Sequence, residues 1–165
     1  MVNTAASESS GDLTGPRRAL VEDAEDVARL LHDFNVEFET PSPGVDLLSA
    51  RLRALLATDS TFAVIAGLEP VSVALVTLRP NVWCEGKVAL LDEMYVVPSR
   101  RGQGIGSAVM SKLLTLVGEM DVELVEINVD EGDLEARRFY ERHGFLGDNP
   151  ETGERSFYYH QELRR

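Results

Sequence analysis

The sequence contains a single cysteine, Cys84, so no disulfide can form within the chain. Its three histidines, His32, His143 and His160, lie far apart, whereas zinc sites take Cys or His ligands in closely spaced pairs. No apolar run reaches the length of about 18 residues that marks a membrane-spanning helix. We therefore expect no disulfide framework, no metal site and no membrane association.

Positive charge is also scarce. The chain has 16 Lys and Arg residues against 28 Asp and Glu residues, which gives a formal net charge of −12. Proteins that bind nucleic acid need a basic face for the phosphates, so the charge balance argues against that class. An acidic surface attracts and concentrates amines, although acidity also simply keeps a protein soluble.

Residues 1–15 are small, polar and punctuated by glycine, which predicts a disordered tail. They lack the basic and apolar regions of a secretory signal, so a cytoplasmic protein is expected. The length of 165 residues, with 44% hydrophobic and 27% charged residues, suits one globular domain. We assign that domain to residues 16–165.

Apolar periodicity and turn signals predict alternating strands and helices along this domain. Asp23 is the expected cap of the first helix, and the segment 40–44 separates it from the second. The order predicts an α/β (α+β) fold in which helices pack on a mixed sheet. The expected strands are 18–21, 61–67, 71–79, 88–97, 122–129 and 156–162, and the expected helices follow residues 23, 44, 104 and 133.

A glycine-rich turn at residues 101–106 is the most informative segment, because it joins a strand to a helix. Glycines let a ligand approach the backbone closely, and the free N–H groups of a helix N-terminus bind anions, phosphates above all. No lysine follows the glycines, which excludes a Walker A loop, and Ser107 stands where a dinucleotide fingerprint has its third glycine. The spacing instead follows the pattern R-x-x-G-x-G.

Together with its flanking residues, this turn resembles the GNAT N-acetyltransferase superfamily. The preceding strand ends in Leu91-Asp-Glu-Met-Tyr-Val96, followed by Pro98. Further along, residues 136–145 match the family's A-x-x-F-Y-x-x-x-G-F motif. The resemblance implies a mostly antiparallel mixed sheet with a central splayed pair of parallel strands, and helices on both faces. It also implies that acetyl-CoA binds between the strands 88–97 and 122–129.

By the same resemblance, the pantetheine amides pair with a strand edge and the helix N-terminus receives the pyrophosphate. Asp133 stands where many relatives have an asparagine, which puts a direct ligand contact there in doubt, and Asn128 is the alternative amide. The expected cofactor-binding residues are Met94, Tyr95, Val96, Arg101, Gly102, Gln103, Gly104, Ile105, Gly106, Ser107 and Asn128.

Acetyl transfer needs a base for the acceptor, a donor to the thioester oxygen and an acid for the leaving thiolate. The resemblance assigns the acid to Tyr140 and the oxygen's donor to the backbone N–H of Val96. Glu93 is the preferred base and Asp92 the alternative. Strict alternation lets only one of these carboxylates face the acceptor, and a bulge would change which one.

The expected activity is therefore transfer of an acetyl group from acetyl-CoA to a primary amine of a small molecule or peptide, by direct attack in a ternary complex. Cys84 has no neighbouring histidine, so an acyl-cysteine intermediate is not expected. Alternatives are a non-catalytic acyl-CoA sensor, or an acyltransferase that uses a longer acyl chain or a hydroxyl acceptor. Whether the chain forms a homodimer is left open.

Overall fold

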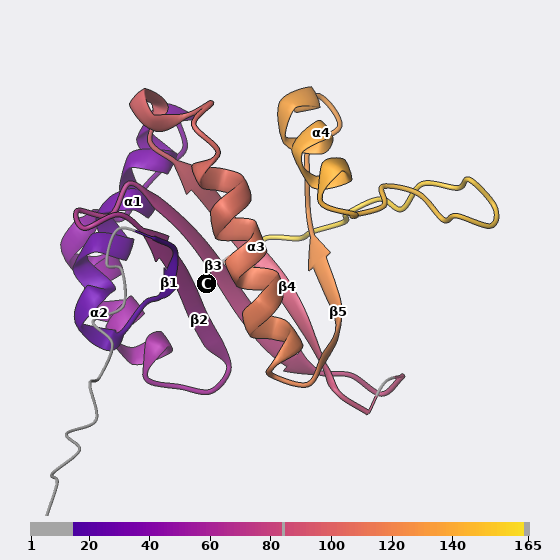
Figure 1. Ribbon diagram of the computed structural model, residues 1–165, viewed down its shortest axis with the longest axis horizontal. Coiled ribbons are helices and arrows are strands. Elements are labelled where there is room, and N and C mark those ends of the chain that lie inside the picture. The colour runs from indigo at the N-terminus through magenta and orange to yellow at the C-terminus, as the bar shows by residue number, and fades with distance from the viewer. Residues whose placement is uncertain (1–14, 84, 164–165) are drawn as a thin grey trace, which may run out of the picture. The chain divides into compact units, whose positions relative to one another are not determined.

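The computed structural model describes residues 15–83 and 85–163 (Figure 1). The predictions made for residues 1–14 and for Cys84 lie outside this range. The chain divides into two compact units, residues 1–125 and residues 126–165.

The sheet contains five strands in sequential order: β1 (Arg17–Arg18), β2 (Thr61–Ala66), β3 (Ser72–Pro80), β4 (Lys87–Val96) and β5 (Val122–Ile127). Strands β1 to β4 pair antiparallel, whereas β4 and β5 form a parallel pair. The predicted mixed sheet is therefore confirmed, but the parallel pair lies at the end of the sheet rather than at its centre.

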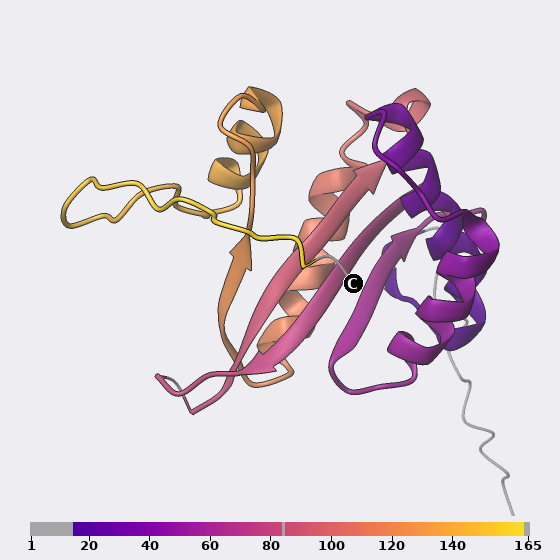
Figure 2. The same cartoon turned by 180° about the vertical axis from the view of Figure 1, so that it is seen from behind.

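Helices α1 (Ala24–Glu37) and α2 (Val45–Leu56) cover one face of this sheet, and α3 (Ile105–Gly118) covers the other (Figures 1 and 2). Alternation along the strands divides the core in the same way. The α1 and α2 side contains the buried cluster Val27, Leu30, Leu31, Leu52, Ala63, Ile65, Val73 and Tyr95. Val109, Met110 and Leu113 are buried on α3, which contacts β2, β3 and β4. Helices on both faces were predicted, and this is confirmed.

The start of α1 differs in one detail from the prediction. Asp23 occupies the cap position, but its side chain makes no capping bond to the helix. Its carboxylate instead accepts two hydrogen bonds from Arg17, at 2.6 and 2.7 Å, and one from the Leu20 backbone N–H at 2.7 Å. The expected strand 18–21 is accordingly reduced to β1, and the 3₁₀ turn Val21–Asp23 follows it.

The second unit contains α4 (Leu134–Arg142). Here the predicted cap is confirmed, because the Asp133 carboxylate accepts a hydrogen bond of 2.9 Å from the Ala136 N–H. Gly144 has φ +88°, the left-handed conformation that follows many helices and that glycine adopts without strain. Strand β5, which leads into this unit, ends at Ile127, two residues before the predicted end.

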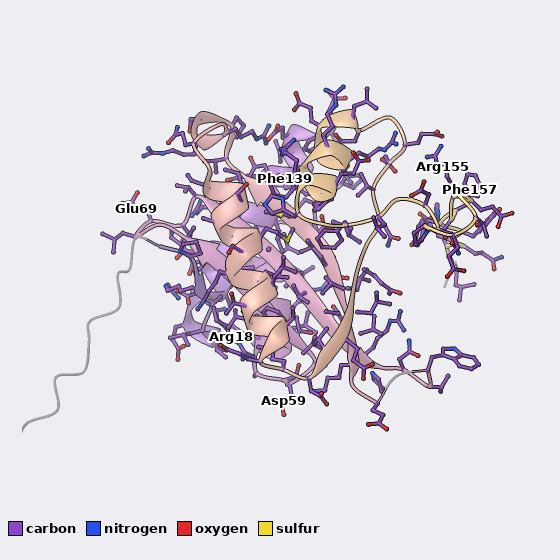
Figure 3. The ribbon with its side chains drawn as sticks, turned by 45° about the vertical axis from the view of Figure 1, so that its right-hand side comes forward. Arg18, Asp59, Glu69, Phe139, Arg155 and Phe157 are labelled. Atoms are coloured by element: carbon purple, nitrogen blue, oxygen red, sulfur yellow. The ribbon has the colours of Figure 1, made fainter. Side chains whose placement is uncertain are left out.

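The predicted strand at residues 156–162 is wrong: these residues form no strand. The segment before them folds locally, with a single bridge between Asp148 and Arg155. In the segment that follows, Phe157 is 69% exposed and Tyr159 is 88% exposed. Figure 3 labels Arg155 and Phe157, where this segment begins. The run of aromatic residues at 157–159 favours a strand, but a strand forms only where a neighbouring edge pairs with it.

Candidate active site

A β-bulge interrupts β4 at Asp92. Leu75 pairs with Glu93 and the next residue, Val76, pairs with Leu91, so Asp92 is an extra residue with no partner position on β3. A bulge of this kind shifts the alternation of side chains by one residue. Residues of β4 on either side of Asp92 therefore cannot be assigned to faces by counting through it.

The bulge places both candidate carboxylates on the same face of the sheet. Glu93 lies opposite Leu75, which packs against the core cluster under α1 and α2. The Asp92 carboxylate accepts a hydrogen bond of 2.6 Å from the Thr77 hydroxyl, two positions along β3 from Leu75. The expectation that only one of the two could face the acceptor is thus wrong. Strict alternation fails because of the one extra residue.

Their surroundings weaken the acidity of both groups. Desolvation raises the pKa of Asp92, although the hydrogen bond from Thr77 opposes the shift. Desolvation also raises the pKa of Glu93, and the neighbouring charge of Asp92 adds to it. Carboxylates whose pKa is raised toward neutrality are better proton acceptors than ordinary surface carboxylates.

At the end of β4, the backbone groups of alternate residues point away from β3. The Val97 N–H donates to the Val71 carbonyl at 3.0 Å, so this pair is hydrogen-bonded across to β3. In an antiparallel ladder hydrogen-bonded and non-hydrogen-bonded pairs alternate, so the backbone groups of Val96 and Met94 point away from β3. Tyr95 has the opposite orientation: its backbone faces β3, and its buried ring lies 5.6 Å from that of Phe34.

The glycine-rich turn follows directly. Gly102 and Gly104 have φ of +71° and +79°, and Gly104 is the N-cap of α3. A Cβ atom added at either glycine would meet nothing within 4 Å. The glycines are therefore required by the backbone conformation rather than by crowding, and the space in front of the helix N-terminus is open. Open N–H groups at the positive end of a 14-residue helix suit an anion such as a pyrophosphate.

A cavity of about 360 Å³ lies beside this turn and reaches the loop between β2 and β3. Glu69, labelled in Figure 3, marks that loop. The cavity is lined by Ala66, Gly67, Leu68, Glu69, Val71, Arg100 and Ile105. Ile105 is the first residue of α3, so the open space continues from the helix N-terminus toward the β2–β3 loop.

Arg101 and Gln103 have partners within the protein. The Arg101 guanidinium donates to both carboxylate oxygens of Glu37, at 2.7 and 2.8 Å, while its Nε donates to the Val96 carbonyl at 2.9 Å. Gln103 Nε2 donates to the Ser99 carbonyl at 3.3 Å. The sequence analysis missed Glu37 and Thr77 as site residues. No local signal marks them, since each lies far in sequence from the residue that it contacts.

In the second unit, the Tyr140 ring is half-buried and contacts both Phe139, labelled in Figure 3, and Phe145 edge to face, with centroids 5.2 and 5.7 Å away. Asn128 follows the end of β5 and is exposed. The structure thus brings together Met94, Val96 and the turn with the two carboxylates in the first unit, while Tyr140 and Asn128 belong to the second.

Comparison with known proteins decides the family. The family model described as the acetyltransferase (GNAT) family matches residues 19–145, which is most of the chain. The chain belongs to this family. The chain is also 32% identical over 89 residues to an uncharacterized N-acetyltransferase of Archaeoglobus fulgidus. That match covers 52% of the chain and 60% of the relative, so it spans less than two thirds of the relative's length.

Solved structures show the same fold. A proposed acetyltransferase from Arthrobacter sp. FB24 is 47% identical, with a TM-score of 0.85 over 93% of this chain and 99% of the other. An aminoglycoside acetyltransferase from an uncultured soil metagenomic sample has 21% identity and a TM-score of 0.76, over 93% and 99% of the two chains. A ribosomal-protein-alanine N-acetyltransferase from Brucella melitensis biovar Abortus 2308 has 18% identity and a TM-score of 0.66, over 91% and 98%.

No helix in residues 15–83 and 85–163 is long and apolar enough to cross a membrane. Within the same residues, no group of three or more His, Asp or Glu side chains is arranged to hold a metal ion.

Proposed function

We propose that this acetyltransferase moves the acetyl group of acetyl-CoA to a primary amine of a small molecule or peptide. One observation carries the proposal. An open helix N-terminus with two left-handed glycines follows strand β4, in which Met94 and Val96 turn their backbone groups away from β3. Such an arrangement suits a ligand that combines a pyrophosphate with an amide-containing chain.

In the proposed complex, backbone N–H groups from Gly102 to Ser107 bind the pyrophosphate of acetyl-CoA. The backbone groups of Met94 pair with a pantetheine amide, as a neighbouring strand would. The Val96 N–H points toward the same edge and stabilises the thioester oxygen as negative charge develops on it. The Val96 carbonyl accepts a hydrogen bond from Arg101, so only its N–H is assigned to the substrate.

The amine nitrogen attacks the thioester carbonyl carbon directly in a ternary complex. A C–N bond forms and the C–S bond breaks, so coenzyme A leaves as a thiolate. The carboxylate pair of Glu93 and Asp92 first binds the ammonium form of the acceptor and then takes its proton, either directly or through water. On the motif match, Tyr140 donates the proton that converts the thiolate to a thiol.

Two structural neighbours suggest which acceptors to test first. One is named an aminoglycoside acetyltransferase and the other a ribosomal-protein-alanine N-acetyltransferase, so a small polyamine and a peptide amine both belong in a substrate panel. Their identities of 21% and 18% support the fold alone, so neither acceptor is assigned to this chain.

The experiment is a free-thiol assay in which the protein, acetyl-CoA and each amine of the panel are combined. We expect amine-dependent release of coenzyme A with at least one acceptor, and loss of most of that release in Glu93→Gln. Tight binding of acetyl-CoA without turnover on any amine or alcohol would instead support the sensor function. Activity with only longer acyl-CoA donors or with alcohols would support the other alternative.

A further inference from the structure

The ion pair between Glu37 and Arg101 joins two distant parts of the first unit. Glu37 is the last residue of α1, and Arg101 is the first residue of the glycine-rich turn, 64 positions later. The two side chains form a bidentate pair, with both guanidinium nitrogens within 2.8 Å of a carboxylate oxygen. Paired, parallel hydrogen bonds of this type fix orientation as well as distance.

Other contacts hold the arginine in the same place. Its Nε donates to the Val96 carbonyl at 2.9 Å, and the guanidinium carbon lies 5.6 Å from the centre of the Tyr95 ring. At least three of the guanidinium N–H groups therefore have protein acceptors. A phosphate that took the same two terminal N–H groups would displace the bidentate carboxylate.

The surroundings of the Glu37–Arg101 pair include a buried aromatic ring. The Tyr95 ring is buried beside Phe34, which belongs to the same helix as Glu37. The Arg101 hydrogen bonds lower the pKa of Glu37 below its ordinary value, so the carboxylate stays ionised at neutral pH. Desolvation, with the Glu37 carboxylate as a second cause, raises the pKa of Tyr95 to about 12, so the phenol keeps its proton.

We infer that Glu37 is a positioning residue for coenzyme binding and that it acts through Arg101. The pair anchors the first residue of the turn to α1 and to the end of β4, while the backbone N–H groups that follow bind the pyrophosphate. In the opposite case, the arginine binds phosphate directly and Glu37 competes for it. This inference rests on the proposed function, and the two cases predict opposite effects of removing Glu37.

The test is a titration of coenzyme A into the full chain by calorimetry, with the variants Glu37→Gln, Arg101→Gln and the double variant. If Glu37 acts through Arg101, each single variant weakens binding by about tenfold, and the double variant is no weaker than either, because both remove one shared interaction. Glu37→Asp keeps the charge and should recover part of the affinity. Glu39→Gln, an exposed residue two positions along, is the matched control and should bind like the wild type.

Kinetics separate positioning from general damage. We expect Glu37→Gln to raise the KM for acetyl-CoA about tenfold with kcat nearly unchanged, and the thermal midpoint of the variant to stay close to that of the wild type. Unchanged or tighter coenzyme A binding in Glu37→Gln, alongside weaker binding in Arg101→Gln, would overturn the inference. If the wild type itself does not bind coenzyme A, the proposed function fails instead.

Discussion

The Thr77 hydroxyl donates a hydrogen bond of 2.6 Å to the Asp92 carboxylate, across a pair of strands whose register shifts by one residue at that point. The bulge turns Asp92 to the face that already holds Glu93, and Thr77 fixes the orientation of Asp92 there. Two adjacent residues of one strand thereby present two carboxylates on one face. This arrangement supports the assignment of acceptor binding and proton removal to the pair.

We predict that Glu93→Gln lowers kcat/KM more than Asp92→Asn does. Among residues 15–83 and 85–163 no side-chain hydrogen bond orients the Glu93 carboxylate, whereas Thr77 holds that of Asp92. Glu93 can therefore reach the amine more easily. Loss of a general base lowers the rate by about 10²–10⁴-fold. The measurement is the pH profile of kcat/KM with the acceptor found by the thiol assay.

The raised pKa of each carboxylate predicts how the rate changes with pH. The base must be ionised, so the wild-type rate should fall as the pH drops through a value above the ordinary carboxylate pKa of about 4. Asp92→Asn removes the neighbouring charge and should move that acid limb to lower pH. A larger rate loss in Asp92→Asn than in Glu93→Gln would reverse the two roles.

Glu93 should also reduce stability at neutral pH. Because its pKa is higher in the folded chain than in the unfolded chain, stability is greatest below the unfolded pKa and falls as pH rises through the folded pKa. Glu93→Gln removes this loss. Urea unfolding at pH 7 should therefore show the variant to be at least as stable as the wild type, although it is less active. A variant that is clearly less stable at pH 7 would contradict this.

Tyr140→Phe should lower kcat and leave the affinity for acetyl-CoA nearly unchanged. The substitution removes only the hydroxyl and keeps the ring contacts with Phe139 and Phe145. General acids contribute about 10²–10⁴-fold, so a loss of that size is expected. Tyr159→Phe, at a position that is 88% exposed, serves as the control and should behave like the wild type. Full turnover in Tyr140→Phe would assign Tyr140 to packing alone.

Ser72→Ala should stabilise the fold by about 1 kcal/mol. Ser72 is fully buried opposite Val96, and its hydroxyl finds no hydrogen-bond partner among residues 15–83 and 85–163. Burial removes the water that hydrates a hydroxyl, and without a hydrogen-bond partner nothing offsets this cost in folding free energy. Ser42→Ala is the contrasting variant, because its hydroxyl lies 2.8 Å from His32 Nδ1, and it should destabilise the fold. Urea unfolding that ranks the two variants in the opposite order would refute this.

Most of the fold could be predicted from the sequence because its signals are local. The 3.6-residue apolar period of α1 and the β-branched runs of β2 and β3 lie within single elements. The strand predicted at 156–162 failed because strand formation depends on a partner edge, which no pattern inside the segment reveals. The Asp23 cap failed because Arg17, six residues earlier, binds the same carboxylate.

In the candidate site too, features set by local sequence could be predicted, and features set by contacts between distant residues could not. The glycine-rich turn could be predicted because the spacing of its glycines lies within one short segment. In the structure, Gly102 and Gly104 adopt left-handed conformations at the start of α3. The bulge at Asp92 could not be located, because register is a property of two strands and depends on how β3 and β4 pair. Glu37 and Thr77 were missed for a related reason: each acts on a residue that only the folded chain brings near.

Binding of acetyl-CoA to Gly104→Asp, compared with the wild type by calorimetry, tests the central claim most directly. Asp is one of the few residues besides glycine that adopt a left-handed conformation such as φ +79°, at some cost in strain. Its side chain would enter the open space before α3 and add negative charge where the pyrophosphate is placed. Gly104→Asn adds the same bulk without the charge, and Gly153→Asp places the same residue at φ +68° in the second unit. We predict no measurable binding to folded Gly104→Asp, weakened binding to Gly104→Asn and wild-type binding to Gly153→Asp. Wild-type affinity in folded Gly104→Asp would contradict the account.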